Sequence, residues 1–207
     1  RILTEVDYVL CEDTRITQKL LNHYQIKAKT ISYHQHSRVF RVEQILSLLK
    51  KGNNLALVSD SGTPGISDPG GKLVREVVDK MGERVQVESV PGPSAVAAAL
   101  SVSGLPTDKF VFLGFPPHKK GRQKFIKNIF NFDFPAMVYE SKHRIAKFLQ
   151  ELAGVDDSVY VVIARELSKM HETIYRGELE QILKNIKEDK EALKEKGEFV
   201  IIIKKAG

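Results

Sequence analysis

Short β-rich runs alternate with helical patterns along almost the whole chain, and this order restricts the possible folds more than any other feature. Strands that alternate with helices are joined by crossover connections, so the order predicts helices packed on a parallel or mixed sheet. Before residue 104 the pattern predicts strands at 6–11, 29–33, 55–58 and 85–90, and helices at 14–24, 39–50, 71–81 and 95–103.

A segment containing Gly and Pro at 104–108 interrupts this pattern, and a new series of units follows it. We therefore place a domain boundary near Asp108. Beyond it the pattern predicts strands at 110–115, 136–140, 159–164, 172–176 and 199–204, and helices at 120–130, 143–152 and 178–196. The strands at 159 and 172 form a predicted hairpin, which makes the second sheet mixed. We expect two α/β domains, residues 1–108 with a mostly parallel Rossmann-like sheet and residues 109–207 with a mixed sheet.

Composition excludes several classes of protein. The 207 residues are 42% apolar and 28% charged, which is typical of a globular protein and not of a disordered chain. No apolar run approaches the roughly 18 residues that cross a bilayer, and the residues before the first predicted strand do not have the basic-then-apolar pattern of a signal peptide. The single cysteine, Cys11, cannot form an internal disulfide. We expect a cytoplasmic protein that does not bind a membrane.

The positive charge is concentrated in one segment. The whole chain carries a formal charge of +6, and residues 118–147, with eight Lys or Arg against two acidic residues, account for all of it. A concentrated basic segment suits binding to a phosphate backbone. The same pattern also fits a solvated helix face, and charge alone leaves both interpretations open.

Two loops that follow predicted strands have an unusual composition. Residues 59–71 contain four Gly, two Pro, two Asp, three Ser and a Thr, and residues 91–95 read Pro-Gly-Pro-Ser-Ala at the start of a helix. In an open parallel sheet ligands bind outside the carboxyl ends of the strands, so both loops are candidate ligand sites. Neither loop matches the glycine-rich dinucleotide pattern or the P-loop, which disfavours NAD and nucleoside triphosphates.

Seven segments, in order along essentially the whole chain, resemble the bacterial small-subunit rRNA (cytidine-2′-O)-methyltransferases of the tetrapyrrole-methylase superfamily. They are Cys11–Arg15, Ser32–Ser37, Ser59–Gly70, Pro91–Ala95, Leu113–Pro117, Tyr139–Arg144 and Ala164–Lys169. Members of this family begin with a further strand, and many end in a small helical domain. By this comparison a first strand is missing before Arg1.

The resemblance implies S-adenosylmethionine as cofactor, bound in a cleft between the two domains, and a homodimer as the working form. It also implies small-subunit rRNA or the 30S subunit as the partner, without a metal ion. The cofactor-binding residues carried over are Asp60, Gly62, Thr63, Ser94 and Ala95, followed by Tyr139, Ala164 and Gly197 at strand ends of the second domain.

Methyl transfer to a ribose hydroxyl is helped by a group that accepts the hydroxyl proton. We expect a carboxylate among Glu12, Asp13 and Asp60 to do so. Asp13 equally suits the N-cap of the following helix, and both interpretations stay open. Arg15, Arg122 and Arg144 are predicted to hold RNA phosphates. His34 and His36 are predicted to line the RNA-facing site, because nearby residues lack the spacing of metal ligands.

Three other functions are compatible with parts of the sequence. A tetrapyrrole or corrin methyltransferase would share the fold but bind a pigment, with no salt-dependent affinity for RNA. A non-catalytic RNA-binding module would keep the basic segment and bind no cofactor, which leaves the 59–71 loop unexplained. A dehydrogenase is disfavoured by the absence of its glycine pattern.

Overall fold

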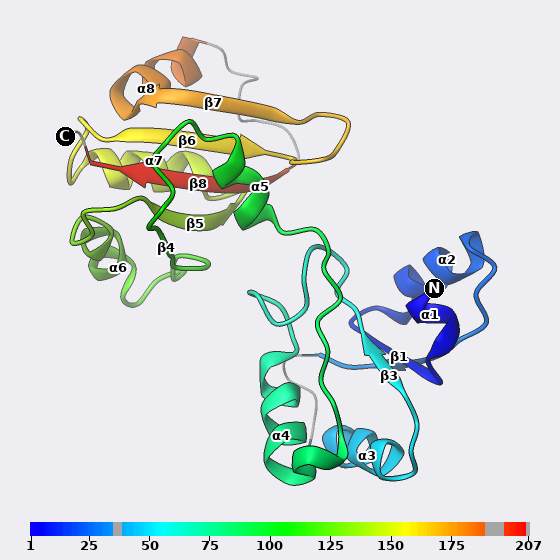
Figure 1. The fold of residues 1–207 in the computed structure, drawn as a ribbon. Helices are drawn as coiled ribbons and strands as arrows, with labels where there is room; N and C mark the ends of the chain where they lie inside the picture. The colour runs from blue at the N-terminus through cyan, green and yellow to red at the C-terminus, as the bar shows by residue number, and fades with distance from the viewer. Residues whose placement is uncertain (35–38, 189–196, 206–207) are drawn as a thin grey trace. The chain divides into compact units, whose positions relative to one another are not determined.

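The structure, a computed structural model, describes residues 1–34, 39–188 and 197–205. The chain forms two compact units, Arg1–Pro93 and Ser94–Gly207, each with its own β-sheet (Figure 1). This confirms the α/β class and the parallel and mixed sheets. The division falls at Pro93, whereas the sequence places its boundary near Asp108. The difference arises because α5 (Ala95–Ser101) packs on the sheet of the second unit.

The first unit is built on a small parallel sheet. Its strands are β1 (Tyr8–Cys11), β2 (Lys29–Ser32) and β3 (Leu55–Leu57), in the order β2-β1-β3. Tyr8 pairs with Lys29 on one side and with Leu55 on the other. The helices are α1 (Ile2–Glu5), α2 (Thr14–His23), α3 (Val39–Lys50), α4 (Gly71–Met81) and the 3-10 turn η1 (Gly82–Arg84).

One face of this sheet is covered by α3 and α4. Leu10 and Ile31 pack there with Ile45, Leu73 and Val77, whose spacings along the two helices place them on single faces. Both helices have the predicted bounds, 39–50 and 71–81. The apolar stripe therefore fixes where the helices dock, and it leaves the loops after the strands free of the core.

Residues 85–90, which the sequence predicts as a strand, have irregular backbone in the structure. Alternating Val residues suggested a strand, but Val87 and Val90 are exposed. No strand of the described sheet lies beside this segment to provide the ladder hydrogen bonds. The prediction of a strand here is wrong. Alternating apolar residues form a half-buried strand only where another strand lies beside them and pairs with their backbone.

The second unit contains a mixed sheet of order β4-β5-β8-β6-β7. The strands are β4 (Val111–Phe112), β5 (Ala136–Ser141), β6 (Tyr160–Arg165), β7 (Thr173–Glu178) and β8 (Glu198–Lys204). Strands β4 and β5 are parallel, β8 is antiparallel to both β5 and β6, and β6 and β7 form the predicted antiparallel hairpin. The carboxyl ends of β4, β5 and β6 consequently lie at one edge.

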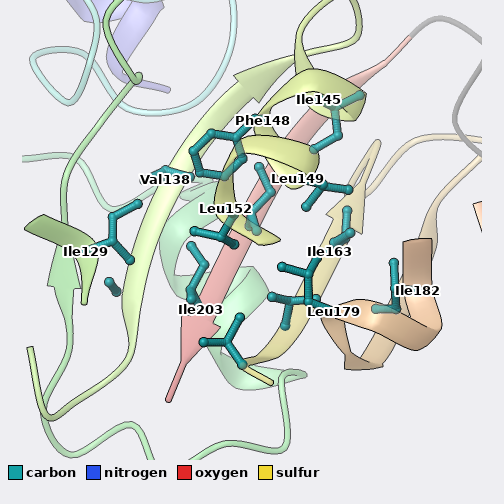
Figure 2. Close-up of a cluster of buried hydrophobic side chains, with 14 of the residues drawn as sticks. Ile129, Val138, Ile145, Phe148, Leu149, Leu152, Ile163, Leu179, Ile182 and Ile203 are labelled. Carbon is teal, nitrogen blue, oxygen red and sulfur yellow. The ribbon is translucent and has the colours of Figure 1, made fainter. Parts of the chain in front are cut away.

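Helices cover both faces of this sheet. The alternation in β8 turns Phe199 and Ile201 to one face and Val200 and Ile202 to the other. The first face packs against α6 (Arg122–Ile129), α7 (Ile145–Ala153) and α8 (Leu179–Glu188), as Figure 2 shows. The second face packs against α5. Burying a side chain such as Phe148 contributes about 1.5–3 kcal/mol, so the first cluster is the main source of stability in this unit.

Within the described residues, no helix has both the length and the apolar composition needed to cross a membrane.

Candidate active site

Polar side chains gather where β1 and β2 end. A depression of about 400 Å³ opens there, lined by Glu12, Asp13, Thr14, Arg15, Ser32 and His34. The two strands are parallel, so their carboxyl ends meet at one edge of the sheet. The structure thus brings together four side chains predicted for the site, namely Glu12, Asp13, Arg15 and His34.

Glu12 is a carboxyl group of this depression whose pKa is raised. Burial raises the pKa of Glu12, and the negative charges of Asp68 and Asp60 raise it further. His34 and the Ser59 hydroxyl lower it by a smaller amount. A carboxylate with a raised pKa is a stronger base than an ordinary exposed Glu, so Glu12 suits the acceptance of a proton.

Asp13 is the N-cap of α2. One of its carboxylate oxygens, Oδ1, accepts the Arg15 backbone N–H at 2.8 Å and Nε at 3.1 Å, and Oδ2 accepts Nη2 at 2.7 Å. These bonds hold the pKa of Asp13 at about 2, which makes it a weak base. Of the two interpretations left open by the sequence, the structure shows the cap. Arg15 remains exposed at the rim.

The loop after β3 is held in shape by its own polar groups. The Ser59 hydroxyl lies 2.8 Å from Asp68 Oδ2 and 2.9 Å from the Ser61 carbonyl. Gly70 has φ +148°, and a Cβ added there would lie 2.9 Å from Leu57 Cδ2. Glycine is therefore required where the loop folds back onto β3.

The two Gly- and Pro-containing loops of the first unit meet each other. Thr63 Oγ1 donates a hydrogen bond of 2.8 Å to the carbonyl of Pro93. Asp60 and Gly62, the other predicted cofactor residues of this loop, are exposed and available to a ligand. Ser94 caps α5 by accepting the Ala97 N–H at 3.4 Å, and Ala95 is the first residue of that helix.

The predicted cofactor residues of the second unit lie near one edge of its sheet. Tyr139 on β5 and Ala164 on β6 both pair with Val200 of β8. The Tyr139 ring makes edge contacts with Phe112 and Phe115, at centroid distances of 4.8 and 5.4 Å. Ala164 is buried.

Gly197 immediately precedes β8 at the same edge. A Cβ at Gly197 would lie 3.2 Å from Glu166 Cγ and 3.3 Å from Arg165 Nε. The absence of a side chain allows the backbone there to approach the end of β6 closely.

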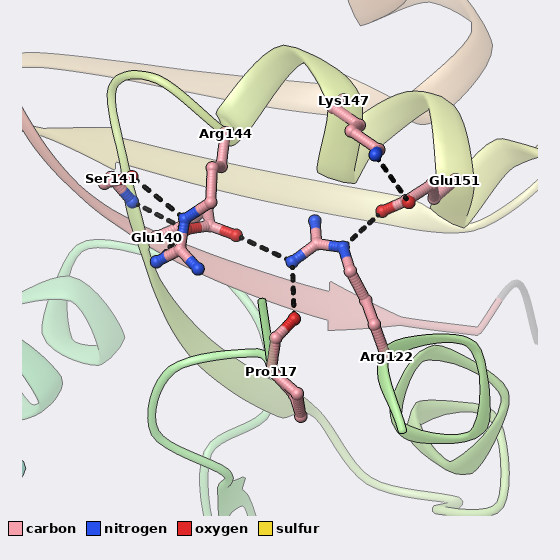
Figure 3. A network of polar contacts seen from close by, with 7 residues as sticks. All are labelled: Pro117, Arg122, Glu140, Ser141, Arg144, Lys147 and Glu151. Carbon is pink, nitrogen blue, oxygen red and sulfur yellow. Dashed lines mark hydrogen bonds and ion pairs between the residues drawn. The ribbon is translucent and has the colours of Figure 1, made fainter. Parts of the chain in front are cut away.

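Arg122 does not face solvent, which disfavours the expectation that it holds RNA phosphates. Its side chain is 5% exposed and lies over the Phe148 ring. Nε donates to Glu151 at 2.7 Å, and Nη1 donates to the Pro117 carbonyl at 3.2 Å and lies 3.4 Å from Glu140 (Figure 3). These bonds engage the guanidinium with groups inside the protein.

Arg144 belongs to the same network. Its Nη2 lies 2.9 Å from Glu140 Oε1, and its Nε donates to the Ser141 hydroxyl at 3.2 Å (Figure 3). Its side chain is 20% exposed, and Glu140 between the two arginines is fully buried. Arg144 therefore anchors the start of α7, which disfavours the predicted phosphate contact.

Sequence reasoning missed Glu140, Glu151, Ser59 and Asp68 as partners of the predicted residues. Ser59 and Asp68 lie in the loop already singled out by its composition, so that signal was available. Glu140 and Glu151 lie 18 and 29 residues from Arg122, and no local spacing links them to it.

The two histidines have different outcomes. The His34 Nε2 lies 2.8 Å from the Ser32 hydroxyl, at the rim of the depression. His36 lies outside the described residues. In the part of the chain that is described, no group of three or more His, Cys, Asp or Glu residues could hold a metal ion.

Comparison with known proteins identifies the family. The sequence model described as tetrapyrrole (corrin/porphyrin) methylases matches residues 1–183. The chain belongs to the tetrapyrrole methylase family. It is a methyltransferase, and the expected resemblance is confirmed.

Three curated relatives carry the name ribosomal RNA small subunit methyltransferase I. The protein from Hydrogenobaculum sp. (strain Y04AAS1) is 42% identical over 206 residues, covering 99% of this chain and 86% of that protein. The Thermotoga maritima protein is 37% identical, covering 98% of this chain and 88% of its own length. The Escherichia coli O157:H7 protein is 42% identical, covering 98% and 70%.

Solved structures of other proteins share the fold. Diphthine synthase superposes with a TM-score of 0.68 at 15% identity, covering 98% of this chain and 81% of that one. The methyltransferase CobJ gives 0.66 at 17% identity, covering 99% and 85%. At these identities the likeness concerns the fold alone.

The methyl donor of this family is S-adenosylmethionine. The loop after β3 fits such a ligand chemically. The exposed Asp60 carboxylate accepts hydrogen bonds from amino and hydroxyl groups, and Gly62, at φ +77°, leaves its backbone uncovered. The nearest atom to a Cβ at Gly62 is the Pro93 carbonyl at 4.0 Å, so this stretch of backbone is open to a ligand.

Proposed function

We propose that this methyltransferase transfers the methyl group of S-adenosylmethionine to the 2′-hydroxyl of a cytidine in small-subunit rRNA. The observation that carries the proposal is the near full-length identity of 42% to a relative named ribosomal RNA small subunit methyltransferase I. The depression at the end of β1 supports it, because it offers a carboxylate suited to a hydroxyl proton beside an exposed cation.

The cofactor-binding residues in this proposal are Asp60, Gly62, Thr63, Ser94, Ala95, Tyr139, Ala164 and Gly197. When bound, S-adenosylmethionine supplies an already activated methyl group, so the protein needs no covalent intermediate. The two Gly- and Pro-containing loops contribute fixed backbone, because Thr63 ties one to the other. Fixed groups lower the entropy cost of alignment, which is the main catalytic requirement for such a transfer.

Glu12 is the proposed general base. Its carboxylate would accept the proton of the ribose 2′-hydroxyl when the S–CH3 bond of S-adenosylmethionine breaks and the methyl group passes to the hydroxyl oxygen, with S-adenosylhomocysteine as the leaving group. Asp60 and Asp68 keep Glu12 basic through their charges. Asp13, which caps α2, instead holds the Arg15 guanidinium at the rim, where an RNA phosphate can reach it. His34 lines the same depression.

The test is methyl transfer from isotopically labelled S-adenosylmethionine to purified 30S subunits and to protein-free 16S rRNA. We expect label in one of these substrates, at a ribose that resists alkaline cleavage and belongs to cytidine. Label transferred to a corrin precursor but not to either RNA would replace the proposal with a pigment methyltransferase. Calorimetric titration with S-adenosylmethionine, with NADH as control, establishes the cofactor independently.

Two further properties belong to this proposal. The protein acts as a homodimer, which light scattering of the purified protein measures. It works in the cytoplasm, where its RNA substrate is assembled.

A further inference from the structure

The eight basic residues between 118 and 147 have different surroundings in the structure. Arg122 and Arg144 are turned inward to buried carboxylates (Figure 3). Lys142 is half-buried, and Lys147 is exposed but lies 3.9 Å from Glu151. The other four lysines, which the site prediction did not include, are exposed. They are Lys119, Lys120, Lys124 and Lys127. The first two lie in the β4–α6 connection, and the other two lie on α6.

The two helical lysines lie on the outer surface of α6. Ile126 and Ile129 turn the opposite side of this helix into the core. Lys124 and Lys127 are three residues apart, so they are neighbours on one helix surface. Lys119 and Lys120 directly precede Gly121, the N-cap of α6. The four charges therefore follow each other along the connection and the helix.

No carboxylate in the part of the chain that the structure describes neutralises these four charges. Among the described residues, none of the four lysines lies within 4.0 Å of a carboxylate oxygen. The carboxylates of the same segment have other partners: Glu140 pairs with the two arginines, and Asp133 lies 3.9 Å from Lys205. Counting the described residues alone, this surface is thus positive without a compensating carboxylate.

The buried arginine fixes the connection that carries the first two lysines. Arg122 Nη1 donates to the Pro117 carbonyl, and the Arg122 backbone N–H donates to the Lys119 carbonyl at 3.3 Å. Pro116 is buried beside them. Arg122 is therefore a positioning residue, because its hydrogen bonds hold the backbone that carries Lys119 and Lys120.

We infer that the lysine surface formed by Lys119, Lys120, Lys124 and Lys127 binds backbone phosphates of the RNA substrate. The inference rests on the proposed function for the identity of the partner, and it adds the surface that holds it. A flexible ammonium group neutralises a phosphate without base specificity, and each neutralised phosphate releases counterions. The surface supplies affinity and orientation, while selection of the nucleotide lies elsewhere.

The test compares two variants of equal charge. In the first, the four lysines of the surface are changed to Gln. In the matched control, the exposed Lys27, Lys50, Lys51 and Lys184 are changed to Gln instead. The affinity of each protein for transcribed 16S rRNA is measured by fluorescence anisotropy over a range of salt concentrations, together with its affinity for S-adenosylmethionine.

We expect the surface variant to lose roughly tenfold or more in RNA affinity at about 0.1 M salt, and its log–log salt slope to fall by roughly 3. Its affinity for S-adenosylmethionine stays at the wild-type value. The control variant retains most of the RNA affinity and slope. A single Lys124→Gln change lowers the slope by about 1.

Equal losses in the two variants would overturn the inference, because net charge rather than this surface would then govern binding. Wild-type affinity of the surface variant for naked RNA, with a loss only for the assembled subunit, would also overturn it and indicate contact with a ribosomal protein. Failure of the proposed function is distinguished separately, because it appears as an absence of methyl transfer by the wild-type protein.

Discussion

Glu12 is the residue on which the proposed chemistry depends. Its carboxyl group must be unprotonated to act as a base, and burial together with Asp68 and Asp60 raises its pKa. Activity should therefore fall on the acidic side at a higher pH than for an ordinary Glu. Among the neighbouring charges, Asp68 raises the pKa of Glu12 the most, so Asp68 should set the pH at which activity falls on the acidic side.

A Glu12→Gln change is expected to lower kcat by about 10²–10⁴, the usual contribution of a general base. Methyl transfer to 30S subunits measures it, with affinity for S-adenosylmethionine as the control. Because the folded-state pKa is raised, the ionised Glu12 destabilises the fold above its unfolded pKa. The Gln variant should therefore gain thermal stability at neutral pH and lose this gain in acid. An active variant would remove Glu12 from the mechanism.

An Asp68→Asn change tests the electrostatic part separately. Asn keeps an oxygen that can accept a hydrogen bond from the Ser59 hydroxyl, but the change removes the negative charge near Glu12. The pKa of Glu12 should fall, so the acidic limb of kcat/KM should move to lower pH. The pH profile of methyl transfer measures this. An unmoved limb would mean that another group controls it.

Asp13 illustrates a different use of a carboxylate, as a helix cap. The pKa of Asp13 is held at about 2 instead of its usual 3.8. The ionised carboxylate therefore stabilises the fold at pH values above about 3.8, and this stabilisation is lost as the pH falls toward 2. Asp13→Ala should lower Tm by a few degrees at neutral pH, and this difference should shrink in strong acid. Asp13→Asn, which keeps a capping oxygen, is the matched control. Thermal unfolding at both pH values measures it.

At the scale of elements, buried polar contacts join the β4–α6 connection, the end of β5 and the start of α7. Glu140, fully buried on β5, lies between Arg122 of α6 and Arg144 at the N-cap of α7 (Figure 3). Such a network fixes geometry more than it adds stability, because removing its charges from water is costly. Removing one partner should therefore destabilise the protein by more than the intact network stabilises it.

Arg122→Ala is expected to destabilise the protein by about 3 kcal/mol, because Glu140 would keep only Arg144 as its cation and Glu151 only the more distant, exposed Lys147. Denaturant unfolding measures the loss. Arg15→Ala removes an exposed guanidinium of the other unit and should change stability much less. Equal stability of the two variants would contradict the role assigned to the network.

The loop after β3 makes a second prediction at this scale. A Gly70→Ala change places a Cβ 2.9 Å from Leu57 Cδ2 and 3.1 Å from the Gly65 nitrogen, at φ +148°. We expect a loss of about 1–3 kcal/mol and weaker binding of S-adenosylmethionine. Gly52→Ala is the control, because φ is also positive there but no atom lies within 4 Å. Equal effects would show that the close approach is unimportant.

At the scale of the whole molecule, cofactor and RNA binding should be separable. Asp60→Ala should lower the affinity for S-adenosylmethionine by roughly tenfold, the value of a lost hydrogen bond to a charged group, and leave RNA affinity unchanged. Calorimetry measures the first and anisotropy the second. Asp157→Ala, at another exposed carboxylate, is the control. Loss of RNA affinity in the Asp60 variant would contradict separate sites.

The sequence predicted most elements of the two units and where the polar loops lie. Helices 39–50 and 71–81 have the predicted bounds, and the hairpin of β6 and β7 was predicted from two β-rich runs and a short turn. The resemblance over seven segments predicted the family. These features depend on neighbouring residues or on motif order, so the chain carries them locally.

Tertiary structure alone decided which charged side chains are available. The sequence presents Arg122 and Lys124 as equivalent members of one basic segment, yet the first is buried and the second is exposed. Arg122 meets Glu140 and Glu151 only because β5 and α7 pack beside α6. Strand order and helix packing determine which side chains distant in the sequence come into contact, and no local sequence pattern predicts these contacts. For that reason the sequence predicted the sheets and loops, whereas the fold determined which side chains inside them can bind a substrate.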